Sequence, residues 1–166
     1  MKLNTILFVC FFTIAAHAQS TLKTSAQQMA QLMLQKRYAE YVKFIHPNIL
    51  KMVGGEAKMV EVVKTAIAQT EAQGLTFQKV TIGEPSKPVS SKDELEAIVP
   101  ETITLKSAKG TYNSTSYLLG ISHDKGKTWF FADTNGKTLA QLKTVFPELS
   151  NQLIVPGKTQ PTLQKN

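Results

Sequence analysis

One acidic residue interrupts an otherwise apolar strand face. Counting by two from Leu95 to Leu105 gives apolar residues at every position except Glu101. A carboxylate on an inward face is costly unless it is paired or its pKa is raised, and such a group could act as a general base. Pro100 favours a different arrangement, because a proline inside a strand requires an irregularity. We therefore expect a bulge that turns Glu101 into water, with the buried carboxylate as the alternative.

Alternation along the other strands places further polar and aromatic residues on faces that could line a cavity. Asp133 ends a strand on the parity of Trp129 and Phe131, while Tyr117 shares parity with Leu119 and Ile121. The sequence does not fix the register across the hairpins, so it does not show that these residues meet. Aromatic residues at such spacing are also typical of a packed core. The candidate pocket residues are Tyr41, Glu101, Tyr117, Trp129 and Phe131, with Asp133 as a second candidate base.

His46 is the histidine that falls within the helical part of the chain. It could donate a proton, as Tyr41 could, but no carboxylate is paired with it in the sequence. Its place before Pro47 favours a role in ending a helix. No second histidine lies at ligand spacing, and Cys10 is the single cysteine, so we expect no metal and no cofactor.

The N-terminus predicts export. Lys2, an apolar run and the small-residue pattern of Ala16 and Ala18 are typical of a signal peptide over residues 1–18, cleaved before Gln19. The apolar run is too short for a membrane span, so we expect no span after cleavage and a periplasmic or secreted product. Positive charge is almost all lysine, with Arg37 the one arginine, which argues against nucleic-acid recognition.

The remaining chain predicts one α+β domain over residues 25–150, after a short lead at 19–24. Helices are expected at about 25–36, from Tyr38 to Ile45, and from Met59 to Gly74. Strands are expected over 75–82 with a slip of phase, then over 95–106, 111–122 and 127–133 as an antiparallel meander. A short helix at about 138–146 closes the domain. We expect residues 151–166 to form a disordered polar tail that does not pack.

A turn motif lies between the last two strands of the meander. The pattern Ser122-x-Asp124-x-Gly126-x-Thr128-Trp129 resembles the Asp-box of sialidases and related propellers. In that motif aspartate and glycine shape a hairpin turn and tryptophan packs beneath it. One copy in a chain of this length cannot build a propeller, so the resemblance implies a structural turn and no glycan chemistry.

The order of elements resembles the nuclear transport factor 2-like superfamily, the ketosteroid-isomerase-like or cystatin-like cone. The chain resembles it in the form of small exported bacterial proteins with no assigned activity. The resemblance is carried by residues 44–47, by Gly54-Gly55 and by residues 127–133, and covers about 25–150. It implies three helices packed on a curved antiparallel sheet. The superfamily includes isomerases, dehydratases, cyclases and pure binding proteins, and no catalytic motif of a branch is found here.

Two functions follow as hypotheses. The first is an exported module that binds a small apolar or amphipathic ligand or a protein partner, without chemistry, and that could form a homodimer. The absence of a nucleophile, a metal cluster or a paired acid and base in the sequence favours it. The alternative is a cofactor-free isomerase or dehydratase that uses Glu101 or Asp133 as base and Tyr41 or His46 as proton donor. Polar groups converging in an apolar pocket would favour the alternative.

Overall fold

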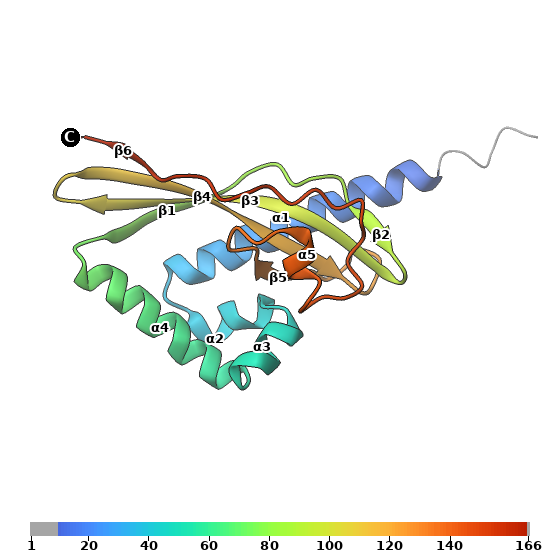
Figure 1. The fold of residues 1–166 in the computed structure, drawn as a ribbon, viewed down its shortest axis with the longest axis horizontal. Helices are drawn as coiled ribbons and strands as arrows, with labels where there is room; N and C mark the ends of the chain where they lie inside the picture. Colours follow the sequence, from blue (N-terminus) through green and yellow to red (C-terminus); the bar gives the residue numbers. More distant parts are fainter. Residues whose placement is uncertain (1–9, 166) are drawn as a thin grey trace, which may run out of the picture.

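The described chain runs from one long helix to a short strand at the C-terminal end (Figure 1). The structure is a computed structural model and describes residues 10–165. Its helical elements are α1 (Cys10–Leu34), α2 (Tyr38–Tyr41), η1 (Val42–Phe44), α3 (Pro47–Val53), α4 (Glu56–Ala72) and α5 (Leu139–Leu142). Its strands are β1 (Thr76–Ile82), β2 (Val89–Ser91), β3 (Glu94–Ser107), β4 (Gly110–Ser122), β5 (Phe130–Asp133) and β6 (Thr162–Gln164).

α1 is longer than the sequence patterns predicted. Residues 19–24, expected as a lead outside the domain, belong to this helix, and Leu22 is completely buried. The apolar positions Ala18, Leu22 and Ala26 follow each other at intervals of four residues and face the sheet. Residues 1–9 of the predicted signal peptide lie outside the described residues. No helix within residues 10–165 is long and apolar enough to span a membrane.

α3 is the second difference from the expected helices. The prediction took Pro47 only as the end of a helix, but in the structure Pro47 begins one. Proline suits the first position of a helix because the N–H it lacks has no partner there. Nδ1 of His46 caps α3 by accepting the N–H of Asn48 at 3.1 Å, and Gly54 ends it with φ of +101°. Four helices, together with η1, therefore precede the sheet where three were expected.

The antiparallel meander is confirmed. Within residues 10–165, six strands form one sheet with the order β1-β3-β4-β5, while β2 pairs with β3 and β6 pairs with β4. The predicted slip of phase in β1 is a register shift between Phe77 and Lys79. β3 and β4 pair without interruption from Leu95 opposite Ser122 to Ser107 opposite Gly110. The fold is therefore α+β with an open antiparallel sheet.

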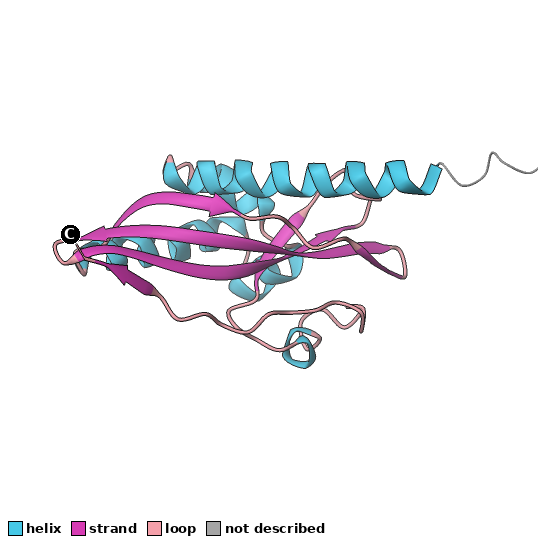
Figure 2. Cartoon of the chain, turned by 90° about the horizontal axis from the view of Figure 1, so that it is seen from above, coloured by secondary structure: helices cyan, strands magenta, loops and turns pink. Residues whose placement is uncertain are grey.

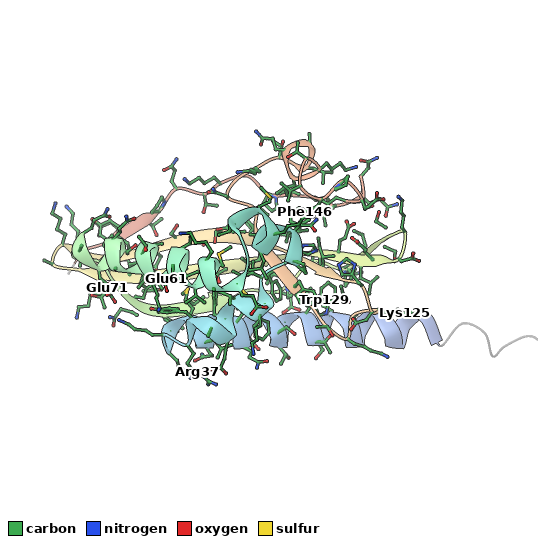
Figure 3. All side chains as sticks on the ribbon, turned by 90° about the horizontal axis from the view of Figure 1, so that it is seen from below. Arg37, Glu61, Glu71, Lys125, Trp129 and Phe146 are labelled. Carbon is green, nitrogen blue, oxygen red and sulfur yellow. The ribbon has the colours of Figure 1, made fainter. Side chains whose placement is uncertain are left out.

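The sheet is covered on both faces. On one face, α1 packs over a cluster that includes Val99, Leu118 and Phe131. On the other, the segment containing α5 packs over Ile98, Leu119 and neighbouring residues. Figure 2 shows α1 and the α5 segment on opposite sides of the sheet, and Figure 3 shows Trp129 on the α1 side and Phe146 on the far side. α4 contacts both α2 and α3, and α2 also contacts α1 (Figure 1).

The expectation of an unpacked tail over residues 151–166 differs from the structure. Leu153 is only 4% exposed and belongs to the cluster around α5. The hydroxyl of Thr159 donates to the carbonyl of Thr115 at 2.6 Å. β6 pairs with the start of β4, next to Gly110, where a Cβ would lie 2.2 Å from the carbonyl oxygen of Gln164. The prediction weighed the polar and proline content, but β pairing uses main-chain groups that any sequence supplies.

Candidate functional site: a buried carboxyl on the helix-covered face

Pro100 does not produce the expected bulge. β3 keeps its register through this residue, with Pro100 opposite Tyr117 and Glu101 opposite Ser116. On the other side of β3, β1 ends at Ile82, and the N–H of Gly83 donates to the carbonyl of Pro100 at 2.8 Å. In an antiparallel strand the N–H and C=O of one residue point the same way, so the N–H that Pro100 lacks would face the end of β1. The proline is tolerated there because β1 ends at this point, so the missing N–H costs one bond at the end of the ladder and leaves the pairing of β3 with β4 intact.

Glu101 is therefore buried on the α1 face, which is the arrangement that strict alternation predicted. Its residue exposure is 8%. The neighbouring strand positions on this face are apolar, including Ile82 directly opposite and Val99 two residues earlier. Burial raises the pKa of Glu101 to about 7, and the negative charge of Asp133 adds to the increase. A hydrogen bond with the hydroxyl of Ser116 acts in the opposite direction.

Asp133 and Tyr41 lie near this carboxyl. Asp133 is opposite Leu118 at the end of β5, one row along the face from Glu101 and Ser116. Asp133 is exposed, and its Oδ1 accepts the N–H of Asn135 at 2.7 Å. The acidic residues on this face therefore reach solvent at the end of β5. Tyr41 is half-buried at the end of α2. Burial, followed by the charges of Glu101 and Asp133, raises the pKa of Tyr41 above its ordinary value.

Three of the predicted site residues, Tyr41, Glu101 and Asp133, thus form one electrostatically linked group. A carboxyl with a pKa near 7 exchanges its proton at neutral pH. The phenol of Tyr41 stays protonated and can donate a hydrogen bond, because its pKa is raised. The group can therefore orient a polar ligand atom or exchange a proton with it.

The three aromatic residues of the predicted pocket do not all lie at this site. Trp129 and Phe131 are on the α1 face, but each is 1% exposed and packs in the core. Tyr117 is opposite Pro100 on the other face, against the cluster around α5. Since β4 alternates strictly, Tyr117 cannot share a face with Ser116, the cross-strand neighbour of Glu101.

His46 is also separate from Glu101. It caps α3, its backbone N–H donates to the carbonyl of Phe131 at 2.8 Å, and its ring packs edge-on against Phe146. Burial, with the neighbouring His123, lowers the pKa of His46 to about 4, so its ring is neutral at pH 7. The predicted role of His46 in ending a helix is wrong, because His46 is the N-cap of α3 and the preceding η1 ends at Phe44.

A second group of titratable residues lies beside His46. Nδ1 of His123 is 3.1 Å from Oε1 of Glu94, and the rings of His46 and His123 are 5.7 Å apart. With Glu148 and apolar neighbours they line a pocket of about 270 Å³. Within the described part of the chain, no set of three or more histidine, cysteine or acidic residues is arranged to hold a metal ion.

Glu96 is a buried carboxylate that the sequence analysis missed. It is completely buried on the α5 face, and its Oε2 accepts the N–H of Ser150 at 2.9 Å. Burial raises its pKa, while the bond from Ser150 opposes the increase. Only the odd-numbered face of β3 was taken as inward. The apolar Ile98 on the even-numbered face was the signal that both faces are covered.

The Asp124 turn has the local geometry that the motif predicts. Oδ1 of Asp124 accepts the N–H groups of Lys127 at 3.0 Å and Thr128 at 2.8 Å, and the hydroxyl of Ser122 at 2.9 Å. Oδ2 accepts the hydroxyl of Thr128 at 2.6 Å. These bonds, the one from the Thr128 hydroxyl first, lower the pKa of Asp124 to about 2.

Gly126 and Trp129 join this turn to α1. Gly126 has φ of +85°, and a Cβ there would lie 2.5 Å from the Cβ of Ala18. Nε1 of Trp129 donates to the carbonyl of Gly126 and to the hydroxyl of Thr21, both at 3.2 Å. The turn therefore fixes the position of α1 on the sheet.

Comparison with known proteins leaves the chain without an assigned relative. No protein-family model matches it, and neither the curated proteins nor the solved structures contain a significant match.

Proposed function

We propose that the protein is an exported module that binds a small apolar or amphipathic ligand on the α1 face of its sheet. The observation that carries this proposal is the polar group of Tyr41, Glu101 and Asp133 within apolar surroundings. Binding sites for small molecules commonly combine an apolar lining with a few polar groups that orient the ligand. Under this proposal the domain is a cone of the nuclear transport factor 2-like kind.

The chemistry of the group supports a ligand with one polar end. Glu101 offers a hydrogen-bond donor when protonated and an acceptor when charged, and Tyr41 offers a donor. Ile82 and Val99 beside Glu101 offer only apolar contacts. A ligand would then place its polar atom between Glu101 and Tyr41 and its apolar part along the sheet.

The test is to identify small molecules that remain bound through native purification from the natural host. Mass spectrometry would compare wild type with Glu101→Gln and with Glu61→Gln, a control at an exposed position on α4. We expect wild type and control to retain the same small molecule and Glu101→Gln to lose it. If all three proteins carry nothing, or if the three retain it equally, this site does not bind the ligand.

A cofactor-free isomerase or dehydratase is the second candidate. The observation that favours it is the Glu101 pKa of about 7 beside the protonated phenol of Tyr41. Glu101 would remove a proton from carbon while Tyr41 donates a hydrogen bond to the developing oxyanion. Incorporation of solvent deuterium into a panel of enolisable ketones tests this reaction. We expect a loss of about a hundredfold in Glu101→Gln if Glu101 is the base, and no enzymatic incorporation if the protein only binds.

A further inference from the structure

A hollow apart from the Glu101 site and from the pocket at His46 lies between α1, η1 and the Asp124 turn. Its volume is about 370 Å³, which is within the range of small-molecule sites. None of Tyr41, Glu101 and Asp133 lines it. Ser25 and Gln28 line it from α1, and Lys127 and Thr128 line it from the turn wall.

The turn wall is held in place by hydrogen bonds. Asp124 accepts the backbone N–H groups of both Lys127 and Thr128 and also the hydroxyl of Thr128. The backbone from which the Lys127 side chain projects is therefore fixed relative to α1. The floor is apolar, because Leu32 and Trp129 are buried and Phe44 is half-buried.

The charges that line this groove do not balance. Glu40 is the one acidic lining residue, and Arg37 holds it through Nε to Oε1 at 2.7 Å and through a second contact from Nη2 to Oε2. Arg37 is outside the lining. Across residues 10–165, neither Lys43 nor Lys127 forms an ion pair with a carboxylate. Arg37 is the main cause of the lowered pKa of Glu40, and Lys43 adds only a small contribution. Glu40 is therefore held mainly by Arg37.

We propose that this groove binds a small organic oxyanion, a carboxylate or a phosphate monoester, with its charged end between Lys43 and Lys127. The hydroxyl of Ser25 and the amide of Gln28 can donate to the same oxygens, whereas the hydroxyl of Thr128 is already donated to Asp124. A short apolar portion of the ligand lies on Leu32 and Phe44.

Trp129 provides the readout, because it is the single tryptophan of the chain and lines the groove. Its fluorescence would be followed during titration with hexanoate and with hexyl phosphate, and with hexanol as the neutral analogue. The variants are Lys43→Gln, Lys127→Gln and both together. Lys125→Gln is the matched control, since Lys125 is in the same turn but does not line the groove.

We expect saturable binding of at least one anion, weaker binding of hexanol, and a loss of about threefold to fivefold in affinity for each lysine variant. The double variant should lose about tenfold or more, and Lys125→Gln should match wild type. The stronger of the two anions identifies the class of oxyanion. Equal losses in Lys125→Gln would show unspecific attraction to a basic protein, and equal binding of hexanol would show an apolar site. Either result, or the absence of binding, overturns the proposal.

Discussion

Glu101 and Glu96 are buried carboxylates on the same strand that face opposite sides of the sheet. Glu96 has a backbone donor from Ser150, whereas Glu101 has the hydroxyl of Ser116 and lies near Tyr41 and Asp133. Alternation along β3 was enough to identify Glu101 as the unusual position. Alternation could not decide whether Glu101 is buried, because burial depends on where β1 ends relative to Pro100. Only the pairing of β1 with β3 fixes that point.

Replacing Glu101 with glutamine should change the pH dependence of stability. The folded-state pKa is about 7 against an ordinary 4.5, so the folded protein binds this proton more tightly than the unfolded chain. The contribution of this proton to the free energy of unfolding is on the order of 3 kcal/mol. It is fully present below about pH 4.5 and is lost as pH rises through 7. We expect urea unfolding of Glu101→Gln to lack this decrease, and the variant to be at least as stable as wild type above pH 7. Superimposable pH profiles for the two proteins would mean that Glu101 is solvated.

At the scale of elements, the strands of the meander and the Asp124 turn were predictable because their signals are local, whereas the short strands β2 and β6 were not predicted. Alternation gave the long strands, and the spacing of Ser122, Asp124 and Gly126 gave the turn. The helices were less predictable where one residue type has two roles. Proline is disfavoured within a helix but favoured at its first position, so Pro47 could end one helix or begin another.

Asp124→Ala should destabilise the hairpin between β4 and β5. The substitution removes the acceptor of the N–H groups of Lys127 and Thr128, and we expect a loss of about 1 kcal/mol or more in the free energy of unfolding. Asp93→Ala is the control, because Asp93 is an exposed turn aspartate whose side chain makes no hydrogen bond within residues 10–165. Equal stability of the two variants in urea unfolding would argue against a structural turn. Loss of glycan binding without loss of stability would point to recognition.

The Asp124 turn should also weaken in acid. The pKa of Asp124 is lowered to about 2. The contribution of its carboxylate to stability is therefore present above the ordinary pKa of 3.8 and is lost as pH falls towards 2. The stability difference between wild type and Asp124→Ala should therefore shrink over that interval. A constant difference across these pH values would assign the effect to something other than the charge of Asp124.

At the scale of the whole molecule, the sequence did not predict that the sheet is covered on both faces. Apolar residues continue after α5, but the prediction weighed the polar and proline-rich residues beyond them and did not place Leu149 and Leu153 over Ile98 and Leu119. Leu142, Phe146, Leu149 and Leu153 recur at intervals of four, three and four residues, but this spacing does not say which surface the residues cover. The first helix was predicted to begin at about residue 25, although the buried Ala18 and Leu22 extend its apolar face towards the N-terminus.

Two adjacent residues test the packing of the C-terminal segment. Leu153 is 4% exposed and Ile154 is 84% exposed. We expect Leu153→Ala to lower the free energy of unfolding by about 2–4 kcal/mol and Ile154→Ala by less than about 0.5 kcal/mol. Thermal or urea unfolding of the two variants measures the difference. Two equally small effects would mean that this segment does not pack on the sheet in solution.

The predicted processing site has its own test. We expect the exported protein to begin at Gln19, because Ala16 and Ala18 supply the small residues that cleavage requires. Cleavage there would separate Ala18 from its contact with Gly126. The intact mass of the exported form decides the matter. A product that retains Ala18 would move the cleavage site towards the N-terminus, and one that retains the whole apolar run would be unprocessed.

The proposed function rests on the site formed by Tyr41, Glu101 and Asp133, and a titration of Glu101 tests this site directly. The chemical shift of its carboxyl carbon, followed by NMR from acidic to alkaline pH, gives the pKa of this group alone. We predict a midpoint near pH 7, and a lower midpoint in Asp133→Asn, because the charge of Asp133 raises the pKa of Glu101. A midpoint near the ordinary value of about 4.5 that is unaffected by Asp133→Asn would mean that Glu101 is solvated and does not form this site.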